Sequence, residues 1–261
     1  MLDTGYLYAK DKNRIFINTC LGCHSACTYC YLPKMGYKNN QQSSEMRTAS
    51  QILADIKNNN YNIDENTLIT LGCFSDCWDE HNKPETIELI KYFLSNGNQI
   101  QLSTKKEVKL EEVAQFQDLI KYLGQLVIFV SSASISHWEK IEKNTDSPMK
   151  RFKTFDISNN LDIPTVLYMK PILQGITIKD VDLYKQVINT YHVKDAVVGS
   201  IFKNQQSEET VHFSNKNQLF YNPVSDEMVI KNDLRSVCNV FLRSSQVMQN
   251  YRERFLNFDE R

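Results

Sequence analysis

Glycine and proline are scarce in this sequence, with 8 glycines and 6 prolines among 261 residues. This scarcity excludes collagen-like repetition, and an apolar content of 41% excludes a disordered or low-complexity chain. Neither sign of charge is in excess, since 30 basic residues face 31 acidic ones. The balance argues against a polybasic nucleic-acid or membrane binder, so any nucleic-acid partner must meet a local basic patch.

Long apolar runs are also missing. A run such as 126–130 is far shorter than the roughly 20 residues that cross a bilayer, so no membrane-spanning helix is predicted. Asp3, Lys10 and Asp11 interrupt the first residues, and no continuous apolar segment there indicates export. We therefore expect a cytoplasmic protein with no membrane partner.

Short apolar strands alternate with helical patterns over the first 200 residues. The predicted strands are 14–18, 67–71, 99–103, 126–131, 165–169 and 195–200, and the clearest predicted helices are 48–57, 85–95 and 109–123. Six strand-helix repeats predict an α/β fold with a parallel sheet curved into a partial (βα)6 TIM-like barrel, because parallel neighbours need crossover helices. Active sites in such folds lie at the carboxyl ends of the strands.

After residue 200 the alternation stops. A hairpin at 211–222 and a final helix at 234–255 are predicted to pack on the barrel as a small carboxyl-terminal extension. The expected organisation is therefore a barrel over 1–200 followed by an extension over 201–261.

Seven cysteines form the most informative pattern, at positions 20, 23, 27, 30, 73, 77 and 238. An odd number crowded toward one end favours metal or redox chemistry in a reducing compartment over a disulfide framework. Cys23, Cys27 and Cys30 have the spacing C-x3-C-x2-C in a loop after the first strand. Three thiolates so spaced can each hold one iron of a [4Fe-4S] cluster and leave the fourth iron open to a small molecule.

Other metal sites are compatible with the same cysteines. The four thiolates from Cys20 to Cys30 could hold zinc, although zinc modules usually separate their two cysteine pairs by a dozen or more residues. Cys20 could instead be the fourth ligand of a ferredoxin-like cluster. Cys20, Cys73, Cys77 and Cys238 could form an auxiliary cluster, or all of the cysteines could simply be buried.

The motif C-x3-C-x-aromatic-C after the first strand resembles the radical S-adenosylmethionine (radical SAM) superfamily. The longer string Gly22-Cys23-x3-Cys27-x-Tyr29-Cys30-Tyr31-Leu32 is similar to spore photoproduct lyase and its relatives, which reverse a thymine dimer in spore DNA. Cys73-Phe74-Ser75-Asp76, 43 positions after Cys30, resembles that family's Cys-Thr-Ser-Asp segment. Further similar segments cover residues 14–175 in order, and the quoted ones are Ser103-Thr104-Lys105, Val130-Ser131, Glu142, Ser147-Pro148, Arg151 and Pro171-Ile172.

The resemblance implies two cofactors, a [4Fe-4S] cluster on Cys23, Cys27 and Cys30 and S-adenosyl-L-methionine on its open iron. Tyr29 is expected against the adenine, or in simple packing. The remaining cofactor contacts implied by the family are Ser75, Lys105 and Ser131, of which Ser131 would meet the ribose. From the residues alone, Lys105 also fits a solvated basic run, and Ser131 could merely end a strand.

The same resemblance implies the reaction. Reductive cleavage of S-adenosylmethionine to a 5′-deoxyadenosyl radical would start repair of a DNA lesion, and Cys73 would return a hydrogen atom to the substrate. Tyr31 would relay the radical from the Cys73 thiol back to deoxyadenosine. A flavodoxin or ferredoxin is the expected electron donor. Cys20, Cys77 and Cys238 have no assigned role.

DNA is the expected partner, although the alternatives stay open. Candidate phosphate contacts are Lys150, Arg151, Lys153, Arg235, Arg243, Arg252 and Arg254, and candidate stacking residues are Phe213, Phe220 and Tyr221. A solvated helix and an ordinary hydrophobic hairpin explain the same residues equally well. The rival functions are a radical SAM enzyme acting on a peptide, nucleotide or RNA, and a non-catalytic iron-sulfur or zinc module.

Overall fold

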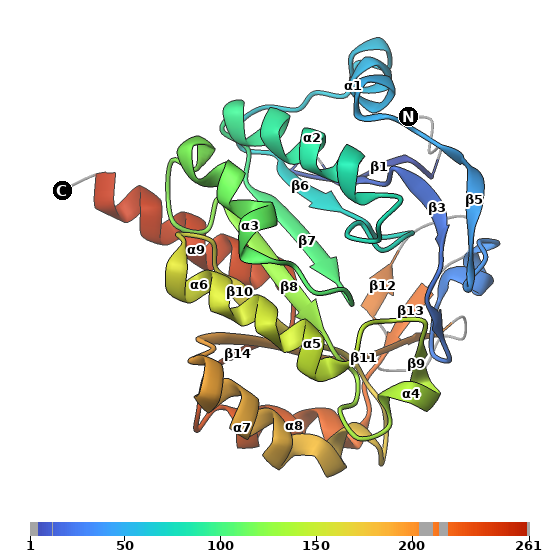
Figure 1. Ribbon diagram of the computed structural model, residues 1–261, viewed down its shortest axis with the longest axis vertical. Coiled ribbons are helices and arrows are strands. Elements are labelled where there is room, and N and C mark those ends of the chain that lie inside the picture. The colour runs from blue at the N-terminus through green and yellow to red at the C-terminus, as the bar shows by residue number, and fades with distance from the viewer. Residues whose placement is uncertain (1–4, 12, 204–210, 214–218, 260–261) are drawn as a thin grey trace.

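A curved parallel sheet forms the centre of the protein (Figure 1). The structure is a computed structural model that describes residues 5–11, 13–203, 211–213 and 219–259. Six strands lie side by side and parallel, in the order β2 (Arg14–Ile17), β6 (Leu68–Leu71), β7 (Ile100–Thr104), β8 (Leu126–Ser131), β10 (Thr165–Ile172) and β11 (Asp195–Lys203). The predicted α/β partial barrel is confirmed.

Alternating side chains give the sheet two apolar faces, as strand β8 shows. Leu126 and Ile128 pack in a cluster with the outer helices, whereas Val127 and Phe129 belong to a cluster on the inner face. Successive residues of a strand point to opposite faces, and a strand buried on both sides is therefore apolar throughout. Ser131, at the end of β8, lines the cavity described below.

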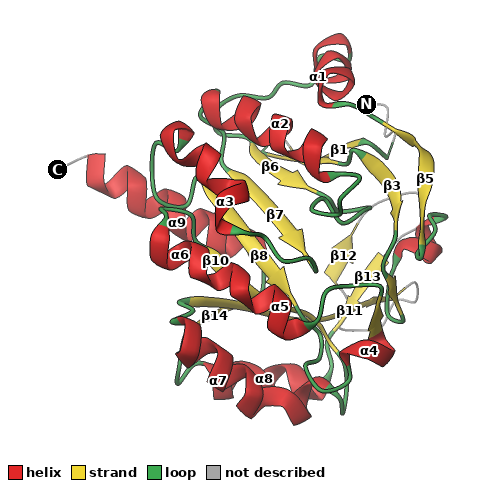
Figure 2. Cartoon of the chain, viewed as in Figure 1, coloured by secondary structure: helices red, strands yellow, loops and turns green. Residues whose placement is uncertain are grey.

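The outer face of the sheet is covered by the crossover helices (Figure 2). They are α1 (Ala49–Asn58), α2 (Lys83–Ser95), α3 (Leu110–Val113) with η2 (Ala114–Leu119), α5 (Pro148–Phe152) with η3 (Lys153–Asp156) and α6 (Ile157–Asn160), η4 (Thr177–Asp180) with α7 (Val181–Tyr191), and α8 (Ser225–Leu234). Thr48 caps α1 with a reciprocal bond to Gln51, which confirms the predicted start of that helix. The helix predicted over 109–123 is wrong in part, because most of it is 3-10 helix around the buried Phe116.

The carboxyl-terminal helix predicted over 234–255 is wrong in its first part and confirmed over 244–255. The chain instead forms β14 (Asn239–Phe241) and then α9 (Ser244–Asp259). Strand β14 pairs in parallel with the first half of β11, at positions 195–197, an edge that would otherwise lack a partner. Helix α9 packs Val247 and Met248 against the inner face of the barrel.

The remaining strands border the barrel. The predicted hairpin is present as β12 (Val211–Phe213) and β13 (Leu219–Asn222), and β13 pairs with the second half of β11. β1 (Leu7–Asp11) runs antiparallel to β2 at the other edge. The cysteine loop is held by β3 (Cys20–Cys23) on β5 (Gln41–Met46) and by β4 (Ala26–Cys27) on β9 (Glu142–Lys143), with η1 (Leu32–Met35) and α4 (Trp138–Ile141) beside them. Among the described helices, none has both the length and the apolar character needed to cross a bilayer.

Close packing of α9 makes Gly124 a sensitive position. Its φ is +89°, and a Cβ atom there would lie 2.5 Å from the Cβ and Cγ atoms of Tyr251. We expect Gly124→Ala to lower the free energy of unfolding by about 2–4 kcal/mol, through left-handed strain and overpacking together. Denaturant unfolding measures the loss.

Gly175→Ala is the matched control. Gly175 has a φ of +68° but no heavy atom within 4 Å of the added Cβ, so only the backbone strain remains. The expected loss of unfolding free energy is about 1 kcal/mol. Equal losses in the two variants would contradict the packing of α9 against this turn.

Candidate functional site

Cys23, Cys27 and Cys30 face one cavity of about 530 Å³ beyond the carboxyl ends of the strands. Their loop is fixed on two sides, because β3 pairs with β5 and Cys27 of β4 lies opposite Glu142 of β9. Gly22 permits the close approach: its φ is +85°, and a Cβ there would lie 2.7 Å from the carbonyl oxygen of Gln41. The three thiols thus share one rigid wall.

The other cysteines divide by position. Cys73 lines the same cavity. Cys20 and Cys77 are almost completely buried and do not line the cavity. Cys238 packs against the hydrophobic cluster that includes residues of α7 and α8. Within the described part of the chain, no group of three or more His, Cys, Asp or Glu side chains could hold a single metal ion. That finding gives the zinc alternative no support. A cubane differs because it spreads its thiolates over separate irons.

Burial dominates the electrostatics of the three thiols. It raises the pKa of Cys23 and Cys30, and it raises the pKa of Cys27 to about 11, while the nearby Lys105 acts in the opposite direction. Without bound metal these thiols therefore keep their protons at neutral pH. Binding of a cluster has to displace the protons, because the ligand form of cysteine is the thiolate.

Cys73 is held by contacts to its side chain and its backbone. Asn18 Nδ2 lies 3.3 Å from Cys73 Sγ, and Asn18 Oδ1 accepts a hydrogen bond of 2.7 Å from the backbone N–H of Phe74. The hydroxyl of Tyr31 donates to the carbonyl oxygen of Cys73. Asn18 was not among the predicted site residues, although it directly follows the first strand, where side chains enter the mouth of a barrel.

Asp76 ties two strand ends together. Its Oδ1 accepts hydrogen bonds from Thr104 Oγ1 at 2.6 Å and from the backbone N–H of Trp78 at 3.1 Å, and its Oδ2 accepts from the backbone N–H of Lys105 at 2.9 Å. Next to it, the buried hydroxyl of Ser75 has no hydrogen-bond partner among the described residues. A buried polar atom without a partner is rare, and this one lies on the wall of the cavity.

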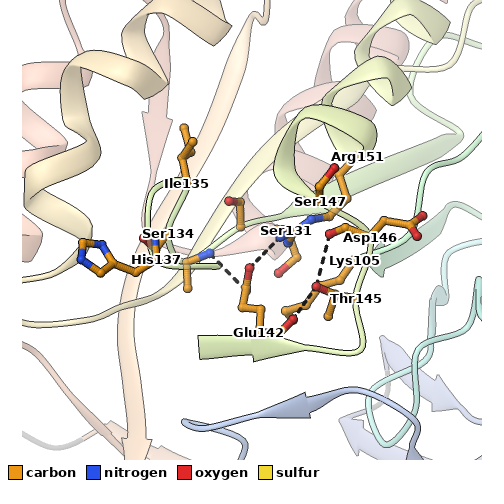
Figure 3. Close-up of polar contacts among 12 residues, drawn as sticks. Lys105, Ser131, Ser134, Ile135, His137, Glu142, Thr145, Asp146, Ser147 and Arg151 are labelled. Carbon is orange, nitrogen blue, oxygen red and sulfur yellow. Dashed lines mark hydrogen bonds and ion pairs between the residues drawn. The ribbon is translucent and has the colours of Figure 1, made fainter. Parts of the chain in front are cut away.

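A buried ion pair, drawn in Figure 3, supports the part of the cavity wall next to Cys27. Arg151 Nη2 lies 2.8 Å from Glu142 Oε2, and both side chains are 0% exposed. Arg151 also donates to the carbonyl oxygen of Ser131, and Glu142 accepts from the hydroxyl of Tyr29. One buried pair therefore positions two of the predicted cofactor contacts.

Lys105 completes this wall. Its Nζ lies 5.7 Å from the centroid of the Tyr29 ring, within range of a cation–π contact. Burial alone would lower the pKa of Lys105, but its electrostatic interactions with Cys27, Glu142 and Asp76 outweigh burial and raise the pKa. Lys105 therefore stays protonated at neutral pH and offers a fixed positive charge to the cavity.

All nine predicted site residues line this one cavity, whereas most of the predicted phosphate contacts do not. The assignment of Arg151 is wrong, because its guanidinium is buried against Glu142. Lys150 is exposed and pairs with Asp146, Arg252 donates to Asn66, and only Arg243 reaches the cavity. The side chains of Phe213, Phe220 and Tyr221 lie outside the described residues.

Comparison of folds gives several solved structures with the same architecture. A variant of spore photoproduct lyase with dinucleoside spore photoproduct is 13% identical, with a TM-score of 0.64, and the match covers 92% of this chain and 80% of that one. Spore photoproduct lyase complexed with dinucleoside spore photoproduct is also 13% identical, with a TM-score of 0.60, and the match covers 85% of this chain and 74% of that one. The radical S-adenosylmethionine methyltransferase TsrM from Kitasatospora setae, with tryptophan substrate and a SAM analog bound, is 9% identical with a TM-score of 0.56. That match covers 89% of this chain and 54% of the methyltransferase.

Sequence comparison identifies the family. No curated protein matches the chain. The model of the Radical SAM superfamily matches residues 17–187, well over half of the sequence, and its span includes all nine predicted site residues. The two cofactors predicted from the cysteine motif, a [4Fe-4S] cluster and S-adenosylmethionine, are the cofactors of this family. The chain belongs to the radical SAM superfamily.

Proposed function

We propose that this enzyme cleaves S-adenosylmethionine reductively and uses the radical chemistry to split a thymine dimer in DNA, as spore photoproduct lyase does. One observation carries the proposal: the thiol of Cys73 shares a cavity with the three cysteines of the motif, although 43 positions separate it from Cys30. A hydrogen-donating thiol is needed there only if a carbon radical forms in that cavity. The similarity to spore photoproduct lyase structures favours the same reaction.

The residues present fit both cofactors. Three soft thiolate ligands on one wall suit an iron-sulfur cluster with one open iron, so Cys23, Cys27 and Cys30 would hold it. When bound, the cluster and S-adenosylmethionine supply a 5′-deoxyadenosyl radical that removes a hydrogen atom from the substrate. The hydroxyl of Ser75, which has no partner among the described residues, and the charge of Lys105 suit the polar methionine end of the cofactor.

The neighbouring side chains orient the adenosine. Tyr29 offers its ring beside Lys105, and its hydroxyl is fixed on Glu142. Ser131 is fixed through its own carbonyl oxygen by Arg151, and we assign its hydroxyl to the ribose. The protein's part is to hold and shield the reacting groups, since the cofactor carries the difficult step.

Cys73 and Tyr31 would complete the cycle. After scission, Cys73 gives the hydrogen of its S–H bond to the substrate carbon radical, and its sulfur keeps the unpaired electron. Tyr31 would then give its phenolic hydrogen to that sulfur and regain a hydrogen atom from the methyl group of 5′-deoxyadenosine, so that the radical returns to the cofactor. Contact between the Tyr31 hydroxyl and the Cys73 backbone supports this order, because it places the phenol beside the thiol-bearing residue.

DNA would present the lesion as an extruded dinucleotide, because a buried cavity cannot accept an intact duplex. We assign electron delivery to a flavodoxin or ferredoxin that docks where the cysteine loop reaches the surface, at the exposed Thr28 and Lys34.

Anaerobic reconstitution, reduction and incubation with a dinucleotide photoproduct test the function. Thymine monomers together with 5′-deoxyadenosine support it.

Cys73→Ala tests the donor role. The variant is expected to cleave S-adenosylmethionine at a rate close to that of the parent, but to convert the photoproduct into abortive products in place of thymine. The physical reason is that no weak S–H bond then faces the substrate radical. Product analysis by chromatography, with deuterium tracing from solvent-exchanged thiol, measures the change.

Cys238→Ala is the control, because Cys238 lies outside the cavity and its loss leaves the donor in place. Clean repair by Cys73→Ala would contradict the donor role. Deoxyadenosine without any turnover of photoproduct would favour a peptide, nucleotide or RNA substrate, which the methyltransferase among the similar structures makes the second candidate. An iron-containing protein that forms no deoxyadenosine would be a non-catalytic module.

A further inference from the structure

Ser25 is a buried polar residue of the cysteine loop to which the proposed cofactor contacts give no role. It lies two positions after Cys23 and two before Cys27, it is 4% exposed, and it lines the cavity. Its hydroxyl has no hydrogen-bond partner among the residues that the structure describes. Burying a hydroxyl without a partner costs free energy, so this side chain calls for an explanation.

The backbone around Ser25 is fixed by hydrogen bonds. The N–H of Cys23 donates to the carbonyl oxygen of Lys38 at 3.0 Å, and the N–H of Asn40 donates to the carbonyl oxygen of Ser25 at 3.0 Å. Directly after Ser25 the chain enters β4, which pairs with β9. Because its backbone is held on both sides, the Ser25 hydroxyl has a defined place beside the ligand cysteines.

The sulfur of Cys23 is the acceptor that this hydroxyl can reach. Burial and the nearby Asp76 raise the pKa of Cys23, whereas hydrogen bonding by the hydroxyl and the backbone N–H of Ser25 to the thiolate acts to lower it. A protonated thiol is a weak acceptor and a thiolate is a strong one. The hydroxyl therefore gains a full partner when the sulfur is a thiolate, which is the form that binds iron.

Ser25 differs from Ser75, the other cavity serine whose hydroxyl lacks a partner in the described part of the chain. Ser75 lies in the turn after β6, and we assign it with Lys105 to the methionine end of the cofactor. Only one residue separates Ser25 from Cys23, and only one separates it from Cys27. Its place in the ligand loop thus favours a role toward the sulfurs and not toward the molecule at the open iron.

We propose that Ser25 is a positioning residue that donates a hydrogen bond to the Cys23 thiolate and raises the reduction potential of the cluster. The inference rests on the proposed ligation of the cluster by Cys23, and it is independent of the substrate. One electron from a reductant makes the cluster and its thiolates more negative, so a donor to sulfur stabilises the reduced form more than the oxidised one. Ser25 therefore eases the uptake of the electron that S-adenosylmethionine cleavage consumes.

A dithionite titration with dye mediators, followed by electron paramagnetic resonance (EPR), tests this on the anaerobically reconstituted protein without S-adenosylmethionine. We expect Ser25→Ala to lower the equilibrium constant of one-electron reduction about 10-fold, a shift of about 59 mV to more negative potential. Ser25→Thr keeps the hydroxyl and should stay close to the parent. The EPR signal comes only from loaded clusters, so the comparison holds even if a variant takes up less iron.

Thr28→Val is the matched control. Thr28 belongs to the same loop and also carries a hydroxyl, but it is exposed and does not line the cavity. Its loss should leave the midpoint potential unchanged. An unchanged potential in Ser25→Ala, equal shifts in Ser25→Ala and Ser25→Thr, or an equal shift in Thr28→Val would overturn the proposal.

A spectroscopic measurement separates a hydrogen bond from a merely structural role. Electron-nuclear double resonance of the reduced cluster, compared in H2O and D2O, detects exchangeable hydrogens next to its sulfurs. One exchangeable coupling of the parent should be missing in Ser25→Ala and present in Ser25→Thr. A shifted potential with every exchangeable coupling retained would also overturn the proposal.

Iron content and 5′-deoxyadenosine formation in the same preparations distinguish this inference from the proposed function. A parent that binds iron and cleaves S-adenosylmethionine, with no shift in Ser25→Ala, would remove the role of Ser25 alone. A parent that forms no cluster would overturn ligation by Cys23 and this inference with it. If the shift is found but no photoproduct is turned over, the DNA substrate is wrong and the role of Ser25 stands.

Discussion

Cys27→Ala is expected to yield a folded protein that takes up no [4Fe-4S] cluster and forms no 5′-deoxyadenosine. The parent should bind about four irons per chain after anaerobic reconstitution. Without the Cys27 thiolate, one iron of the cluster would lose its protein ligand. Among the described residues that line the cavity, no fourth cysteine of the motif loop could replace it. Iron and sulfide analysis, visible absorption and chromatography of the cleavage products measure the effect.

Cys20→Ala is the control that discriminates between the metal sites. Cys20 is 1% exposed, belongs to the same loop and does not line the cavity. It should be dispensable for the radical SAM cluster and essential for a four-cysteine zinc site or a ferredoxin-like cluster. Loss of iron in Cys20→Ala would contradict our assignment of the ligands, and so would full cleavage activity in Cys27→Ala.

Arg151→Met is expected to have the largest effect on stability. It leaves the carboxylate of Glu142 buried without its cation, and breaking a buried pair in this way costs about 3–5 kcal/mol. Because Glu142 also holds Tyr29, and Arg151 holds the Ser131 backbone, cofactor binding should weaken as well. Denaturant unfolding and a titration with S-adenosylmethionine measure the two effects.

Lys150→Met is the matched control next to it. Lys150 pairs with Asp146 at 3.1 Å, but its side chain is 52% exposed, and surface pairs contribute about 0–1 kcal/mol. The double variant Glu142→Leu/Arg151→Met should recover much of the stability, since no uncompensated charge is then buried. Equal losses in Arg151→Met and Lys150→Met would contradict the buried ion pair.

The barrel could be predicted from the sequence because its strands have local signatures. Each parallel strand is a short run of apolar residues, and the pattern depends on neighbours along the chain. The segment after Leu234 could not be predicted in this way. Val237, Val240 and Phe241 fit a helical repeat, yet the segment pairs as β14 because the first half of β11 offers a free edge.

The basic stretch around Arg151 shows the same limit at the level of a side chain. Lys150, Arg151 and Lys153 resemble a surface patch when read as charge alone. Arg151 points inward because the first turn of α5 places it opposite Glu142, which follows α4 in the chain. Asn18 was missed for a related reason, since its role depends on Cys73, 55 positions away.

The spacing of Cys23, Cys27 and Cys30 by itself predicted the loop that we assign to the cluster, because three ligands within eight residues need little help from the rest of the fold to converge. Which of the remaining sulfurs joins them was decided by tertiary structure. Cys20 is 1% exposed and does not line the cavity, whereas Cys23, three positions later on β3, does. The turn at Gly72, with a φ of +76°, brings Cys73 to the mouth while Cys77 packs beneath it, a contact between strand ends that neighbouring residues alone do not encode.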